Sequence, residues 1–88
     1  MLLSTTDDFF NSINRNGVVA VLFLTLDYSV PNNLKSIFDD PNVFVFDVDD
    51  SNIDLVQVVK IPQLRIYVDG SEKVSLTGDD ILKWKSHI

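Results

Sequence analysis

Two segments dominate the hydrophobic pattern of the chain: residues 18–26, VVAVLFLTL, and residues 42–49, NVFVFDVD. Both are rich in β-branched and aromatic residues, which favour strands. The first shows no alternation of apolar and polar positions, and this is typical of a strand buried on both faces. We therefore expect two central strands of a sheet that has helices on both sides.

Short segments with apolar residues at helical spacing flank these strands. The polar run Ser4–Asp8 supplies N-cap and first-turn residues for a first helix, which Asn16–Gly17 would end. Between the two strands, residues 34–38 carry apolar side chains at helical spacing and predict a helix of about two turns. After the second strand, residues 53–60 predict a short helix that is weakened by its β-branched content.

The C-terminal part of the chain predicts a hairpin and a last helix. Residues 63–78 read as two strands joined at Asp69–Gly70, a strong turn signal. The helix that follows would be anchored by apolar residues that include Trp84. The order αβαβαββα predicts one α/β domain over residues 1–88, with a four-stranded mixed β-sheet flanked by helices. A leading strand would have to lie in residues 1–3 or be missing.

Composition and charge remove several classes of function. Of the 88 residues, 45% are apolar and the net charge is −6, which disfavours disorder and nonspecific binding to nucleic acid or anionic membranes. The chain has no cysteine, so disulfides, thiolate catalysis and cysteine-ligated zinc are excluded. No apolar stretch is long enough for a transmembrane helix, and the N-terminus lacks a basic signal-peptide region. We expect a cytoplasmic domain that binds no nucleic acid, membrane, cofactor or metal.

The segment DVDDSNIDLVQVVKIPQLRIYVDGSEKVSLTG (47–78) resembles the corresponding run of thioredoxins. In both, a strand that ends in Asp is followed by a short helix, Ile-Pro, a hydrophobic strand, a Gly turn, another strand and a glycine. The intervals from Pro62 to Gly70 and from Pro62 to Gly78 are those of the family. The resemblance extends over nearly the whole chain and implies a thioredoxin-like fold, with Ile61–Pro62 as the family's cis peptide.

The redox site of that family has no counterpart in this sequence. The resemblance places residues 28–31 on the four Cys-x-x-Cys positions, so both sulfurs are absent. It places Leu22 where the family buries a proton-relay acid, and Val45 where a lysine lies beside that acid. An unpaired buried carboxylate is costly, so the acid has no reason to persist once the thiols are lost. The pattern indicates a domain without dithiol chemistry.

We therefore predict a redox-inactive thioredoxin-like protein that acts as a protein–protein interaction module. It would bind an extended segment of another protein through the surface that holds the dithiol in active family members. In the family, the backbone before the cis-proline is unpaired and can hold such a segment by β-type hydrogen bonds. The predicted partner-binding residues are Tyr28, Ser29, Val30, Pro31, Lys60, Ile61, Pro62, Thr77 and Gly78. No catalytic residue and no metal ligand is predicted.

Two other functions stay open. Thr77–Asp80 resembles the glutaredoxin motif in which a glycine followed by acids binds the glutathione amino group. Tyr28 and Ser29 lie where transferase-like members of the superfamily hold a thiolate-stabilising hydroxyl. The first alternative is therefore a glutathione-binding or transferase-like enzyme, although the second glycine and the catalytic cysteine of glutaredoxins are missing. The second is a structural subunit of a larger assembly, for example a viral one, which would use the outer faces of the domain.

The other candidate residues have simpler structural explanations. Asp79–Asp80 suit the positive end of a helix. The acids between Asp47 and Asp54 lack the glycine and the distal glutamate of a calcium loop, so a solvated turn is expected. A lone His87 completes no catalytic or metal-binding set. Arg65 is expected on a solvated face of the hairpin, with an interface anchor as the alternative.

Overall fold

The computed structural model describes residues 2–3, 5–25, 32–57 and 60–87, and a mixed sheet forms its centre. The strands are β1 (Leu2–Leu3), β2 (Val18–Leu24), β3 (Val43–Asp47), β4 (Gln63–Val68) and β5 (Ser71–Thr77). The helices are α1 (Thr6–Ile13), α2 (Lys35–Phe38) and α3 (Ile53–Val56), together with the 3-10 helices η1 (Asn32–Leu34) and η2 (Gly78–His87). This is the α/β architecture that the sequence predicts.

The sheet has five strands, in the order β1–β3–β2–β4–β5. β1 and β2 are parallel to β3, whereas β4 is antiparallel to β2 and β5 is antiparallel to β4. The expectation of four strands was therefore wrong. The additional strand is β1, in which Leu2 pairs with Val45 and Leu3 with Phe46. Because a two-residue strand is too short to show a periodic pattern, the sequence could only indicate where it would have to lie.

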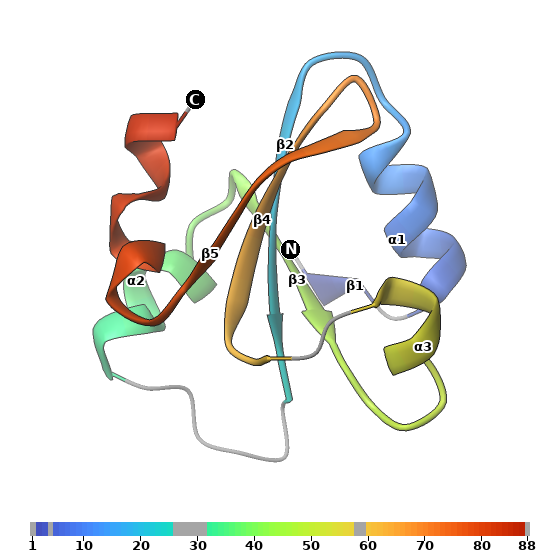
Figure 1. The fold of residues 1–88 in the computed structure, drawn as a ribbon, viewed down its shortest axis with the longest axis horizontal. Helices are drawn as coiled ribbons and strands as arrows, with labels where there is room; N and C mark the ends of the chain where they lie inside the picture. The colour runs from blue at the N-terminus through green and yellow to red at the C-terminus, as the bar shows by residue number, and fades with distance from the viewer. Residues whose placement is uncertain (1, 4, 26–31, 58–59, 88) are drawn as a thin grey trace.

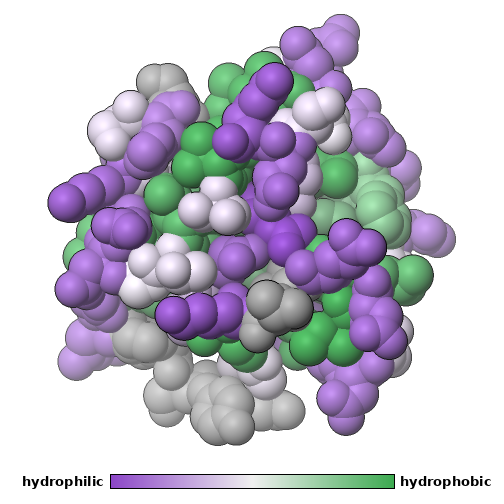
Figure 2. All heavy atoms as spheres, in the orientation of Figure 1, coloured by the Kyte–Doolittle hydropathy of each residue, from purple (hydrophilic) through white to green (hydrophobic). Residues whose placement is uncertain are grey.

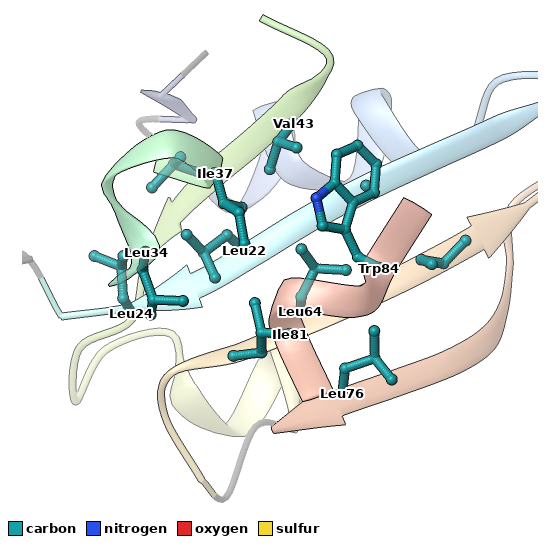
Figure 3. Close-up of a cluster of buried hydrophobic side chains, with 12 residues drawn as sticks. Leu22, Leu24, Leu34, Ile37, Val43, Leu64, Leu76, Ile81 and Trp84 are labelled. Atoms are coloured by element: carbon teal, nitrogen blue, oxygen red, sulfur yellow. The ribbon is translucent and has the colours of Figure 1, made fainter. Parts of the chain in front are cut away.

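Helices cover both faces of the sheet, with α1 and α3 on one side and α2 and η2 on the other (Figure 1). The buried apolar residues accordingly form two clusters. The α1/α3 cluster consists of Leu3, Phe9, Ile13, Val19, Val21, Phe23, Phe46, Val48, Val56 and Tyr67. The α2/η2 cluster consists of Ala20, Leu22, Leu24, Leu34, Ile37, Val43, Val45, Leu64, Ile66, Leu76, Ile81 and Trp84 (Figure 3). Alternate residues of β2 thus enter opposite clusters, which explains why this strand has no polar position.

The start of α1 follows the capping signals of its sequence. The Thr5 hydroxyl accepts a hydrogen bond from the Asp8 backbone N–H at 3.1 Å, and Asp7 and Asp8 lie in the first turn, near the positive end of the helix dipole. Phe9 and Ile13 point into the sheet and are buried. The helix is therefore fixed at its N-terminus by capping and along its length by one apolar face.

The helices after β3 and β5 differ from the sequence-based expectation. α3 ends at Val56, because Gln57 adopts a left-handed conformation with φ 55°, whereas a helix over residues 53–60 was expected. η2 is a 3-10 helix rather than an α-helix. Its buried residues Ile81 and Trp84 are three positions apart, which is the repeat that aligns side chains in a 3-10 helix. No helix in the described part of the chain is long and apolar enough to cross a bilayer.

Candidate functional site

The predicted partner-binding residues that the structure describes meet where the strands of the sheet end, at the bottom of the sheet in Figure 1. The start of β4 lies there between the ends of β2 and β5, since Gln63 pairs with Phe23 on one side and with Thr77 on the other. Residues 60–62 lead directly into Gln63, and Gly78 directly follows Thr77. The structure therefore brings together Lys60, Ile61, Pro62, Thr77 and Gly78, which we name the site edge. The other predicted residues, Tyr28, Ser29, Val30 and Pro31, lie outside the described residues.

The site edge presents backbone as well as side chains to solvent. Lys60, Ile61 and Gly78 are exposed, and Pro62 and Thr77 are half-buried. The peptide bond between Ile61 and Pro62 is cis. Within the described residues, no hydrogen bond links the backbone of Lys60 or Ile61 to another part of the chain. Any hydrogen-bond partner of these backbone groups therefore has to come from outside the described residues.

The positions that the thioredoxin resemblance assigns to a relay acid and its lysine are neighbours in the sheet. Leu22 and Val45 are opposite each other in β2 and β3, and their exposed fractions are 0% and 1%. Both belong to the α2/η2 cluster, which contains only apolar side chains. A charged group at either position would have to be desolvated. This part of the molecule is thus a packed core beside the site edge.

The side chain of Arg65 fixes the segment that leads into the site edge. Its Nη1 donates to the Val56 carbonyl at 2.8 Å and its Nη2 to the Gln57 carbonyl at 2.7 Å, at the C-terminal end of α3. Its Nε donates to Oε1 of Gln63, the first residue of β4, at 2.6 Å. One guanidinium therefore bonds to both sides of the 58–62 segment. A cation is favourable at a helix C-terminus because the last carbonyls of the helix are unpaired.

The environment of Arg65 differs from the solvated face that the sequence predicts. Its side chain is 13% exposed rather than solvated, and it lies over the ring of Phe23, 5.0 Å from the ring centroid. Its Nε is 3.0 Å from Oε1 of Glu72 on β5. The alternation along β4 does place Gln63, Arg65 and Tyr67 on one face. The carbonyl acceptors come from α3, however, and the early end of α3 was not predictable from the pattern.

Tyr67 lies on the same face of β4 and belongs to the α1/α3 cluster. Its exposed fraction is 5%. Burial raises the pKa of the Tyr67 hydroxyl, and this effect is opposed by the hydrogen bond and positive charge of Arg65. Tyr67 is therefore held in its neutral form and serves the packing of this face.

Asp49 organises the exposed turn between β3 and α3. Its Oδ1 accepts hydrogen bonds from the backbone N–H of Ser51 at 2.9 Å and of Asn52 at 3.1 Å, and also from the Ser51 hydroxyl. The Ser51 hydroxyl is the main cause that lowers the pKa of Asp49, and the two backbone donors add to it against a smaller effect of desolvation. The described residues contain no group of acids or histidines arranged to hold a metal ion. The turn is thus stabilised by its own hydrogen bonds.

Acidic residues gather at the end of the molecule that carries the site edge. This end comprises the start of α1, the β3–α3 turn with α3, and the start of η2. Its acids are Asp7, Asp8, Asp47, Asp49, Asp50, Asp54, Asp79 and Asp80, and its bases among the described residues include Lys35, Lys60 and Arg65. The opposite end is mixed, with Arg15, Lys73 and Lys85 among Asp39, Asp40, Asp69 and Glu72. The negative charge of the chain is therefore concentrated around the site edge.

Exposed apolar side chains lie in the segment that Arg65 ties down and in the helix α3 that precedes it. Leu55 of α3 is 58% exposed, and Ile53 and Ile61 are each 37% exposed. Figure 2 shows hydrophobic residues reaching the surface over α3, at the lower right, between hydrophilic ones. The end of the molecule that carries the site edge thus combines apolar contact points with a surrounding of carboxylates.

Several solved structures with a similar fold are thioredoxins. The sequence itself matches no family model and no curated protein. The structure is similar to thioredoxin from Malassezia sympodialis, with a TM-score of 0.72 and 20% identity over 98% of this chain and 84% of that chain. It is similar to thioredoxin from Plasmodium falciparum, with a TM-score of 0.72 and 16% identity over 98% and 95%. For mitochondrial thioredoxin 3 from Saccharomyces cerevisiae the TM-score is 0.70, with 23% identity over 99% and 91%.

These similarities agree with the strand order, the mixed pairing and the placement of helices on both faces of the sheet. They extend over nearly the full length of the chain, so the fold is shared as a whole and not only in the C-terminal half. The chain nevertheless has no cysteine. It therefore has the thioredoxin fold, in a form without the residues that dithiol exchange requires.

Proposed function

We propose that this protein is an interaction module that binds an extended segment of another protein at the site edge and performs no catalysis. The observation that carries the proposal is that the backbone of Lys60 and Ile61 has no hydrogen-bond partner among the described residues. Arg65 holds both sides of this segment in place. An extended chain can supply the absent hydrogen bonds as an added strand does, and a preorganised edge lowers the entropy cost of binding.

The surroundings of the site edge indicate the chemistry of the partner segment. Ile61 and Leu55 offer apolar contact, and the carboxylates around them favour a positively charged chain. Complementary charge raises the association rate and excludes acidic competitors. We therefore expect a segment that carries lysine or arginine beside apolar side chains, and an affinity that falls as ionic strength rises.

Affinity capture from the cells that make the protein tests this proposal. The bait is the wild-type chain, and the first variant is Ile61→Ser, which removes apolar contact at the site edge. The matched control is Val18→Ser. Val18 is 53% exposed and is the first residue of β2, at the end of that strand away from the site edge, so both variants remove an exposed β-branched apolar side chain. Captured proteins are quantified by mass spectrometry at low and high salt.

The proposal expects a partner that is lost with Ile61→Ser, kept with Val18→Ser, and weakened at high salt. A partner that is insensitive to both Ile61→Ser and Pro62→Ala would contradict it. Loss with Val18→Ser alone would favour the structural-subunit alternative, because that function uses the outer faces of the domain.

Glutathione binding is the alternative that the same edge would allow, since Thr77 and Gly78 lie beside Pro62 and are followed by Asp79 and Asp80. Titration of the isotope-labelled protein with millimolar glutathione distinguishes the two functions. Binding of the tripeptide would shift the amide resonances of Ile61 and Asp79, and an unchanged spectrum would remove the alternative.

A further inference from the structure

The turn between α1 and β2 contains the dipeptide Asn16–Gly17, and both residues are exposed. Asparagine is a thermolabile residue. Its side-chain carbonyl carbon can be attacked by the backbone nitrogen of the next residue, and a glycine there offers no side chain to hinder the approach. Attack by the Gly17 nitrogen on Cγ of Asn16 closes a succinimide ring and releases ammonia. Water then opens the ring at either carbonyl, which yields aspartate or isoaspartate.

A carboxylate from a distant part of the chain holds the nitrogen that would attack. The Gly17 N–H donates to Oδ1 of Asp69 at 2.7 Å, and the Gly17 carbonyl accepts from the Asp69 N–H at 3.0 Å. Asp69 occupies the hairpin turn between β4 and β5 and has φ 52°; Gly70 beside it has φ 86°. These two hydrogen bonds join the α1–β2 turn to the hairpin and fix the peptide units before and after Gly17.

We propose that Asn16 is a site of spontaneous deamidation and that Asp69 controls the rate. The Gly17 nitrogen must lose its proton and rotate towards Asn16 before it can attack. The charge-assisted bond to Asp69 opposes the rotation, and the nearby negative charge opposes formation of the amide anion. Asn16 therefore deamidates slowly while Gly17 is hydrogen-bonded to Asp69. It deamidates at its intrinsic rate when the hairpin turn separates from the α1–β2 turn.

The product has a structural consequence in the same place. Either product carries a new carboxylate next to the Gly17–Asp69 pair, and isoaspartate also adds a methylene group to the main chain. Repulsion between like charges and the altered backbone would both weaken the bonds to Asp69. A molecule modified at Asn16 should thus lose the contact between the α1–β2 turn and the hairpin.

The test measures deamidation of the folded full chain at mildly alkaline pH, by peptide mapping with mass spectrometry and by enzymatic methylation of isoaspartate. The key variant is Asp69→Gly, because glycine accepts the positive φ of this position and only the carboxylate is lost. We expect conversion of Asn16 to accelerate about tenfold, which corresponds to about 1.4 kcal/mol. Asn11, which precedes Ser12 inside α1, is the internal reference.

Two controls isolate the role of Asp69. Glu72→Gln removes a carboxylate from the same hairpin that faces Arg65 rather than Gly17, and it should leave the rate at Asn16 unchanged. In urea, wild type and Asp69→Gly should convert Asn16 at one common rate, faster than that of the folded wild type. Equal rates for folded wild type and folded Asp69→Gly would overturn the proposal, as would equal acceleration by Glu72→Gln. Loss of Gly17 amide protection from hydrogen exchange in Asp69→Gly provides an independent check.

Discussion

Replacing Arg65 by alanine is expected to lower the free energy of unfolding by about 4 kcal/mol. Hydrogen bonds from a charged donor contribute about 1.5–3 kcal/mol each, and Arg65 makes two to the end of α3. The contact with the Phe23 ring adds about 0.5–2 kcal/mol. The pair with Glu72 adds little, because Glu72 is 48% exposed. These contributions overlap in one side chain, so the expected loss is smaller than their sum.

Urea unfolding followed by circular dichroism and by the fluorescence of Trp84 measures this loss. Trp84 is buried in the α2/η2 cluster, on the opposite face of the sheet from Arg65, so it reports global unfolding. Domains have a stability of about 5–15 kcal/mol, so at the lower end of this range the alanine variant would retain about 1 kcal/mol and its unfolded form would be measurable without urea. Arg65→Lys keeps a charge but not the planar fork of donors, and we expect it to lose about 2 kcal/mol.

Glu72→Gln is the matched control, because it removes the ion pair and leaves the bonds to α3. Its expected loss is below about 1 kcal/mol. A loss for Arg65→Ala no larger than that of Glu72→Gln would refute the reasoning, since the bonds to Val56 and Gln57 would then contribute nothing. If Arg65→Lys lowers the free energy of unfolding as much as Arg65→Ala does, a positive charge without the planar set of donors contributes nothing at the α3 carbonyls.

Three further predictions concern turns and caps. Gly70→Ala should cost about 1–3 kcal/mol in a thermal or urea melt, because Gly70 has φ +86° and a Cβ there would lie 3.3 Å from Oδ1 of Asn14; an unchanged melt would contradict this. Thr5→Ala should cost about 1 kcal/mol through loss of the cap on Asp8, whereas Thr5→Ser should be close to neutral. The lowered pKa of Asp49 means that its contribution to stability is present above its ordinary value of 3.8 and is lost as pH falls through the lower folded value. Acid unfolding of Asp49→Asn should thus depend less on pH below 3.8 than that of wild type, and equal slopes would contradict the assignment.

The elements that the sequence predicted are those whose own apolar, turn or capping residues specify them. β2 and β3 were evident because the sheet buries both of their faces, and Asp69–Gly70 marked the β4–β5 turn because positive φ is needed there. The start of α1 followed from its capping residues. In each case the local preference and the tertiary contacts favour the same conformation.

The remaining features depend on contacts between distant parts of the chain. β1 is defined only by pairing with β3. The early end of α3 places two carbonyls against Arg65. The sequence around α3 gives no sign of a bond to Arg65, and the sequence around Arg65 gives no sign of a bond to α3. η2 is a 3-10 helix whose buried residues, Ile81 and Trp84, pack in the α2/η2 cluster, whereas the charges and apolar residues of this segment predicted an α-helix. The hydrogen bond from Gly17 to Asp69 spans 52 positions and is likewise set by the assembled sheet.

Site-specific photocrosslinking in the cells that make the protein tests the central claim most directly. A photoreactive residue is placed at Ile61 in one variant and at Val18 in another, so that the two probes differ in position and replace similar exposed side chains. Binding at the site edge predicts that the probe at position 61 forms a discrete crosslinked product that diminishes at high salt, and that the probe at position 18 does not. A product at position 18 alone, or identical products from both positions, would contradict binding at the site edge.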